Sequence, residues 1–152
     1  LMKIVIGIGG VSSSGKSSIT NALREHLLHI HDNTDRINVD VFHQDDYYIE
    51  TDDPSQDWEC PEIIDNNTLL LHILKWKNEN HHSTTKHYLH EILFVEGFLV
   101  SSVPSILEQC DFTFFLLVSK SICKERRFSR DSWIRDNPSY FEHVWNRYLH
   151  YN

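Results

Sequence analysis

The fold of this chain depends on one short run of residues near its N-terminus, Gly10-Val11-Ser12-Ser13-Ser14-Gly15-Lys16-Ser17. Before this run, residues 1–8 are mostly apolar and rich in β-branched side chains, which predicts a strand. After it, Ile19, Leu23 and Leu27 recur at helical spacing. The run is therefore expected to form a glycine-rich turn that leads from a strand into a helix.

The turn has the spacing G-x-x-x-x-G-K-[ST], which indicates a phosphate-binding loop when a strand precedes it and a helix follows. Its glycines let successive backbone N–H groups point toward one anion, and the helix N-terminus adds partial positive charge. Lys16 is expected to contact the terminal phosphates of a nucleoside triphosphate, and Ser17 to hold a bound Mg²⁺. The alternative, a serine-rich turn that fits the pattern by chance, is disfavoured by the flanking elements.

Strands and helices are expected to alternate along the rest of the chain. Apolar runs predict strands at 37–41, 92–100 and 112–118, the last of a kind buried on both faces. Helices are expected from residue 61, over 121–129, and at the C-terminal end, where Ser139 and Glu142 have the spacing of a capping box. This order predicts one α/β domain over 1–152, a parallel sheet with helices on both faces. Ligands of such sheets bind at the carboxyl ends of the strands.

Composition excludes several classes of protein. With 152 residues, 14 basic and 22 acidic, the net charge is −8, which disfavours a nucleic-acid-binding protein. No apolar run approaches the roughly 20 residues that cross a bilayer, and the first residues lack the features of a secretion signal. The 3 cysteines have no CxxC spacing, which argues against a disulfide framework or a cysteine zinc site. A cytoplasmic protein without a membrane or nucleic-acid partner is expected.

A phosphate loop alone leaves kinases, GTPases, ATPase motors and nucleic-acid enzymes open. No Asn-Lys-x-Asp segment for reading guanine is present, and the chain is short for a motor. A small-molecule kinase needs a base near the acceptor hydroxyl, and Asp45, just beyond a predicted strand, is the candidate. Its alternative role is a solvated acidic turn or a helix cap. Glu96 interrupts an apolar run, so Mg²⁺ or its water shell is its expected partner, with a structural salt bridge as the alternative.

Basic residues concentrate after the last predicted strand, at Arg126, Arg127, Arg130 and Arg135. From a lid over residues 126–139, their guanidinium groups are expected to neutralise charge on a transferred phosphoryl group; a solvated helix face is the alternative. The chain also has 11 histidines, and a group of them at 81, 82, 87 and 90 lacks an established metal-ligand spacing. We interpret that group as part of a solvated polar connection.

Taken together, these features resemble the nicotinamide riboside kinases, a family in the uridine kinase-like group of P-loop kinases. The resemblance covers nearly the whole chain. It rests on the loop Gly10 to Ser18 and on five further segments: Gln44-Asp45-Asp46-Tyr47-Tyr48, Trp58-Glu59-Cys60-Pro61-Glu62, Val95-Glu96-Gly97-Phe98, Cys123-Lys124-Glu125-Arg126-Arg127-Phe128-Ser129-Arg130 and Tyr140-Phe141-Glu142-His143-Val144-Trp145. The loop occurs in many families. The segments that begin at Gln44 and at Tyr140 occur in far fewer families and are therefore more specific.

The resemblance implies a three-layer P-loop kinase fold and phosphorylation of the ribose 5′-hydroxyl of nicotinamide riboside, with Mg²⁺ and with ATP or GTP as donor. The implied catalytic residues are Lys16, Asp45 and Arg127. The implied nucleotide contacts are Gly10, Val11, Ser12, Ser13, Ser14, Gly15, Lys16, Ser17, Ser18, Arg126 and Arg130. The implied nucleoside contacts are Asp45, Asp46, Tyr47, Tyr48, Trp58, Glu59 and Arg127. The implied metal contacts are Ser17, Asp45 and Glu96.

Two departures from the family pattern bear on these expectations. Glu59 stands where many relatives carry Asp, which lengthens a ribose contact by one methylene. The chain ends at Asn152, where the family continues into a further strand and helix, so the last strand and helix are expected to be absent. A shortened variant, a fragment and a protein completed by a partner remain open, as do a monomer and a homodimer. Alternative functions are a uridine-cytidine or other nucleoside kinase, and a nucleotide-binding regulatory protein without turnover.

Overall fold

The computed structural model describes residues 2–30, 37–53, 55–79 and 90–152. Its centre is a sheet of four strands: β1 (Met2–Gly10), β2 (Ile37–His43), β3 (His90–Glu96) and β4 (Phe112–Leu116). The strands pair in parallel in the order β2-β3-β1-β4. All four carboxyl ends therefore lie at one edge of the sheet.

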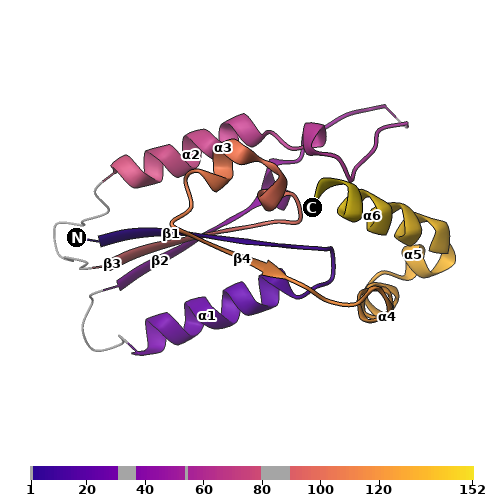
Figure 1. The fold of residues 1–152 in the computed structure, drawn as a ribbon, viewed down its shortest axis with the longest axis horizontal. Coiled ribbons are helices and arrows are strands. Elements are labelled where there is room, and N and C mark those ends of the chain that lie inside the picture. The colour runs from indigo at the N-terminus through magenta and orange to yellow at the C-terminus, as the bar shows by residue number, and fades with distance from the viewer. Residues whose placement is uncertain (1, 31–36, 54, 80–89) are drawn as a thin grey trace.

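Helices cover both faces of this sheet (Figure 1). On one face lies α1 (Lys16–Ile30), and on the other lie α2 (Asn66–Asn78) and α3 (Pro104–Leu107). The remaining helices gather beyond the carboxyl ends of the strands: α4 (Lys120–Arg130), α5 (Ser132–Asp136) and α6 (Pro138–Tyr151). Short 3₁₀ turns occupy Gln44–Tyr47, Pro61–Ile63 and Val100–Ser102. The predicted three-layer parallel α/β fold is confirmed.

Alternate side chains of the central strands form two apolar layers. Val5 of β1 and Leu93 of β3 are fully buried in a cluster with Leu69 and Ile73 of α2. Facing the opposite way, Phe94 of β3 belongs to a second cluster, against which residues of α1 pack. Since side chains alternate across a strand, burial on both faces requires the continuous apolar runs seen in the sequence.

The prediction that residues 112–118 are buried on both faces is wrong. Phe112 and Phe114 of β4 are each 56% exposed, and Leu117 is 80% exposed. Among the described residues, β4 has a single neighbouring strand, β1, and so lies at the edge of the sheet. An apolar run shows that a strand can be buried, but its place in the sheet depends on pairing with distant residues.

Helix boundaries also differ from the predictions. Pro61 begins a 3₁₀ turn, whereas α2 starts at Asn66 after Asp65, whose Oδ1 accepts a hydrogen bond from the Thr68 N–H at 2.9 Å. The final helix starts at Pro138, since proline suits the first helical turn, and its N-cap residue in the described structure, Asn137, makes no side-chain capping bond. The predicted capping box at Ser139 is therefore wrong. Within the described ranges, no helix combines the length and apolarity needed to span a membrane.

Candidate active site

The glycine-rich run forms the expected turn between β1 and α1. Gly10 has a φ of 141° and Gly15 a φ of 101°, and Ser13 between them has a φ of 65°. A Cβ on Gly10 would lie 2.9 Å from the Leu116 carbonyl oxygen, so close packing on β4 also excludes a side chain there. These left-handed positions curve the backbone into a concave turn of the kind that binds anions.

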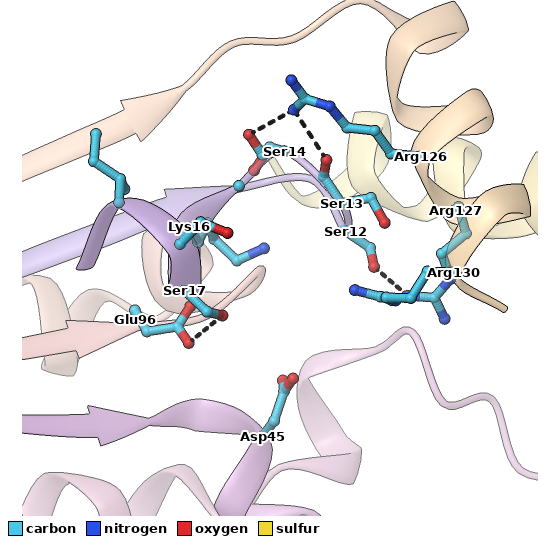
Figure 2. Close-up of a pocket in the computed structure, with 13 residues that line it drawn as sticks. Ser12, Ser13, Ser14, Lys16, Ser17, Asp45, Glu96, Arg126, Arg127 and Arg130 are labelled. Atoms are coloured by element: carbon cyan, nitrogen blue, oxygen red, sulfur yellow. Dashed lines mark hydrogen bonds between the residues drawn. The ribbon is translucent and has the colours of Figure 1, made fainter. Parts of the chain in front are cut away.

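A polar cavity of about 650 Å³ opens over this turn. Figure 2 shows the serines of the turn in the middle of the view, Arg126 above them, Arg127 and Arg130 to their right, and Asp45 pointing up from below. Its lining comprises Ser12, Ser13, Ser14, Gly15, Lys16, Ser17, Ser18, Ile19, Asp45, Glu96, Arg126, Arg127 and Arg130. The structure thus gathers most of the residues implicated in nucleotide and metal binding around one space.

Lys16 extends from the first turn of α1 into this cavity. Its side chain is largely buried, and Nζ donates a hydrogen bond to the Val11 carbonyl at 3.2 Å. Burial lowers the pKa of Lys16, while the nearby carboxylates of Glu96 and Asp45 oppose that shift. The two carboxylates near Lys16 therefore favour the charged form of its ammonium group.

Glu96 meets Ser17 at the floor of the cavity. Ser17 Oγ donates a hydrogen bond to Glu96 Oε1 at 2.8 Å, and His43 Nδ1 lies 2.6 Å from the same oxygen. Glu96 is the last residue of β3 and does not interrupt a longer strand, and it is only 5% exposed to solvent. The expectation that this buried carboxylate needs polar partners is therefore met by a hydroxyl and an imidazole.

His43 was missed by sequence analysis. In the parallel pairing of β2 with β3, His43 stands directly opposite Glu96. Both residues end their strands, so each belongs to the edge where ligands of such sheets bind. The predicted strands ended at residues 41 and 100, so alignment of their ends would not have paired His43 with Glu96. The pairing requires the strand ends and the register of the structure.

The oxygen ligands available near Lys16 suit Mg²⁺. They are the Ser17 hydroxyl and the carboxylates of Glu96 and Asp45, all of which line the cavity over the phosphate loop. In the part of the chain that the structure describes, no three His, Cys, Asp or Glu side chains form a metal cage. Mg²⁺ usually takes one or two carboxylates from a protein and its other ligands from phosphate and water, so this sparse oxygen set fits the ion.

Asp45 is held by the residue before it. Gln44 is fully buried; its Oε1 accepts a hydrogen bond from the Leu99 N–H at 3.0 Å, and its Nε2 donates to Asn66 Oδ1 at 3.3 Å. Asp45 opens onto the cavity, yet the protein around it removes enough water to raise its pKa, against the opposing effect of Lys16. The site thus contains a carboxylate with an increased affinity for protons.

A second cavity, of about 480 Å³, adjoins the first. The lining residues common to both are Ser12, Lys16, Asp45, Arg127 and Arg130, and the second adds Tyr48, Glu59, Phe98, Asp131 and Trp133. Glu59 is buried, and its Oε1 accepts a hydrogen bond from the Tyr140 hydroxyl at 2.8 Å. Burial raises the pKa of Glu59, while the hydrogen bond from Tyr140 opposes the rise.

The arginines of α4 contact the phosphate loop directly. Arg126 Nη1 donates to the carbonyl oxygens of Ser13 and Ser14, and Arg127 Nη1 donates to Ser12 Oγ (Figure 2). Arg127 and Arg130 line both cavities, whereas Arg126 lines only the first of the two. Arg130, which the sequence assigned to the nucleotide alone, thus also borders the second space. Arg135 lies in the last turn of α5 and lines neither cavity.

Other predicted nucleoside contacts lie outside the second cavity. The Tyr47 hydroxyl is 2.9 Å from Nδ1 of His72 in α2. Asp46 and Trp58 line neither cavity, although the Trp58 ring lies 6.1 Å from that of Tyr48. Sequence analysis missed Phe98, Asp131 and Trp133; Trp133 was findable as an aromatic residue within the predicted lid. The histidine group at 81–87 lies outside the described residues, and His90 begins β3.

Comparison with known proteins assigns the chain to a family. No family model matches it. It is 32% identical to nicotinamide riboside kinase 2 of Mus musculus, over 99% of this chain and 80% of the relative. It is also 32% identical to nicotinamide riboside kinase 1 of Homo sapiens, over 97% of this chain and 75% of the relative.

A solved structure supports the fold independently. A candidate uridine kinase from Bacillus stearothermophilus superimposes with a TM-score of 0.59 at 22% identity, covering 89% of this chain and 83% of that one. Its identity is too low to carry more than the fold, which is that of the P-loop kinases. Because the identity to the mouse and human enzymes extends over nearly the whole sequence, the chain belongs to the nicotinamide riboside kinase family.

Proposed function

We propose that this protein transfers the γ-phosphoryl group of ATP to the 5′-hydroxyl of nicotinamide riboside, forming nicotinamide mononucleotide for NAD synthesis. The observation that carries the proposal is the junction of the two cavities. One cavity has the phosphate loop and the other has aromatic and acidic walls, and they meet at Ser12, Lys16, Asp45, Arg127 and Arg130. A kinase needs a base and cations at such a junction, between donor and acceptor.

On the donor side, the N–H groups of the loop and the Lys16 ammonium group would hold the phosphates of ATP. Ser17, Glu96 and Asp45 would hold Mg²⁺ directly or through water. When bound, the ion supplies charge neutralisation on the phosphate oxygens. Arg127 and Arg130 border both cavities, so their guanidinium groups would stabilise the charge that builds up on the transferred group.

On the acceptor side, Asp45 would accept the proton of the 5′-hydroxyl. As that oxygen bonds to the γ-phosphorus, the bond from phosphorus to the bridging β–γ oxygen breaks and ADP leaves. The raised pKa of Asp45 suits this role, since a base of greater proton affinity takes the hydroxyl proton more readily. A positioned general base is typically worth about 10²–10⁴ in rate.

The second cavity also fits a pyridinium nucleoside. Glu59, Tyr48 and Trp133 line it; Glu59 would accept hydrogen bonds from ribose hydroxyls, and Tyr48 and Trp133 would offer aromatic faces. A cationic ring binds favourably over aromatic faces and near a carboxylate such as that of Glu59. The second carboxylate of the wall, that of Asp131, is held in ion pairs with Arg127 and Arg130. These features favour nicotinamide riboside over the uncharged base of uridine.

The test is a coupled ADP-release assay with ATP and Mg²⁺, comparing nicotinamide riboside, uridine and no acceptor, and repeated with GTP. We expect turnover with nicotinamide riboside that Asp45→Ala abolishes. Turnover that favours uridine would replace the acceptor in the proposal. Nucleotide binding by folded protein without turnover of any nucleoside would instead support the regulatory, non-catalytic alternative.

A further inference from the structure

One face of α6 contacts the short segment of residues 57–60, which contains Glu59. Tyr140, His143 and Arg147 follow one another at intervals of three and four residues, so their side chains share a face of the helix. All of them reach residues 57–60, which we call the acceptor loop. Tyr140 binds Glu59 of this loop, as described above.

The other two side chains converge on Asp57. His143 Nε2 lies 2.8 Å from Asp57 Oδ1, and Arg147 Nη2 forms an ion pair with Asp57 Oδ2. The Glu59 backbone N–H donates a hydrogen bond to Oδ1 at 3.0 Å. Asp57 thereby joins the helix to the backbone of its own loop two residues further on.

The carboxylate is kept charged in this setting. Partial burial raises the pKa of Asp57, but the hydrogen bonds from His143 and from the Glu59 N–H outweigh it and hold the pKa below its usual value. The Asp57 side chain is 21% exposed, so these bonds are partly shielded from water. Hydrogen bonds to a charged group in such surroundings are stronger than those between neutral groups.

Asp57 nevertheless lines neither cavity. Its effect on the site passes through Glu59, which lines the second cavity. The Glu59 carboxylate accepts a hydrogen bond from Tyr140 of α6, and the Glu59 backbone N–H donates one to Asp57. A carboxylate that must meet ribose hydroxyls needs its backbone held as well as its oxygens, since small displacements weaken such contacts.

We propose that Asp57 is a positioning residue that ties the acceptor loop to α6 and thereby sets the affinity for the nucleoside. The inference rests on the proposed function, because it assumes that the second cavity binds the acceptor. It predicts an effect on acceptor binding and not on ATP binding, since the bonds that join Asp57 to His143, Arg147 and Glu59 in the described structure do not involve the phosphate loop. That loop meets α6 elsewhere, in the apolar cluster of Val11 with Phe141 and Tyr148.

The test compares Asp57→Ala with Asp53→Ala. Asp53 is a matched control from the same acidic segment, because its carboxylate accepts only from Ser55 within its own turn in the described structure. For Asp57→Ala we expect the nucleoside KM to rise about tenfold, with kcat and the KM for ATP within about twofold of the parent. Arg147→Met should raise the same KM by a smaller factor, because His143 and the Glu59 N–H still hold Asp57. The double variant should exceed Asp57→Ala by little, because Asp57→Ala already removes the ion pair with Arg147.

Amide hydrogen exchange gives a readout that needs no turnover. Asp57→Ala should speed exchange at the Glu59 N–H at least tenfold while the exchange of β1 and β3 stays unchanged, which also reports that the fold is intact. Unchanged exchange at Glu59, an equal rise in both KM values, or a nucleoside KM matching that of Asp53→Ala would overturn the proposal. Since exchange is independent of the acceptor, it decides the anchoring role even if the proposed function fails.

Discussion

Ser17 Oγ lies 2.8 Å from Glu96 Oε1, although 79 residues separate them in the sequence. The hydroxyl comes from the first turn of α1 and the carboxylate from the last residue of β3. In the pairing of β1 with β3, Ile8 stands opposite Glu96, so the strand that leads into the phosphate loop carries its serine to the carboxylate. Parallel pairing thus brings two oxygen ligands to the cavity that would hold phosphates.

Glu96→Gln should weaken the binding of Mg²⁺. The amide keeps the size of the side chain but removes its negative charge beside Ser17, so we expect the Mg²⁺ concentration for half-maximal rate to rise roughly 10- to 100-fold. Initial rates measured against free Mg²⁺ at fixed ATP check this, and chelation of Mg²⁺ should abolish turnover. Glu108→Gln, at the exposed residue that follows the last residue of α3, is the control. If Glu96→Gln has the same Mg²⁺ dependence as the parent protein, the metal role of Glu96 is wrong.

Asp45→Asn should lower kcat by about 10²–10⁴, because the amide cannot accept the hydroxyl proton. Binding of ATP should remain, since the loop and Lys16 are unchanged. Rapid-quench measurement of product together with calorimetric titration of a nucleotide analogue separates these steps. Asp46→Asn is the comparison: Asp46 lines neither cavity, so its kcat should fall far less. Equal losses in the two variants would argue against Asp45 as the base.

As the pH is lowered, the rate should begin to fall at a higher pH than the pKa of an ordinary carboxylate would predict. Burial raises the pKa values of both Asp45 and Glu59, and the proposed roles of both need the deprotonated form. As pH decreases through these raised values, each carboxylate takes up a proton and its role is lost, so kcat/KM for the nucleoside should decline with a slope above one. In Glu59→Gln one titrating group is gone, and the slope should drop to one. The prediction is wrong if kcat/KM of the parent protein declines only near the pKa of an ordinary aspartate.

Gly97→Ala should destabilise the fold and the site together. A Cβ at this position would lie 2.3 Å from Gln44 Oε1 and 2.4 Å from Gln44 Cβ, so the buried glutamine that precedes Asp45 must move. We expect a loss of about 1–3 kcal/mol in the free energy of unfolding, typical of overpacking, and a lower kcat in protein that is still folded. Urea titration and the ADP-release assay check the two effects.

Gly7→Ala is the comparison for that substitution. There the nearest atom, Cys110 Sγ, would lie 3.1 Å from the new Cβ, and only a small shift is needed. Its effect on stability should be smaller, and kcat should stay near the parental value. A larger loss of kcat in Gly7→Ala than in Gly97→Ala would count against the link between Gln44 and Asp45.

Local features of the site could be predicted because their physics spans a few residues. The phosphate loop needs only glycines, a lysine and a serine at fixed spacing between a strand and a helix, and all of these are contiguous. Lys16, Ser17 and Asp45 could be named from such signals. The arginines after β4 could be named from the local concentration of basic charge. The resemblance to the family added Glu59 and the division of the arginines between nucleotide and nucleoside, since their segments match at the level of motifs.

Long-range contacts could not be predicted in the same way. Trp133 and Asp131 reach the second cavity through the turn between α4 and α5, and Tyr47 contacts α2 although it stands two residues after Asp45. The exposed face of β4 has the same apolar composition as a buried strand. In each case the local pattern permits several placements, and packing against distant elements selects one.

The sequence by itself therefore determined the class of the fold, the phosphate loop and the kind of chemistry, because periodicity and motif spacing act between near neighbours. Tertiary structure alone decided that His43 and Ser17 both contact one oxygen of Glu96, and that two cavities meet at Lys16 and Asp45. It also decided that side chains of α6 bind Asp57. Those relationships depend on strand register and helix packing, where a shift of one residue would point each side chain elsewhere.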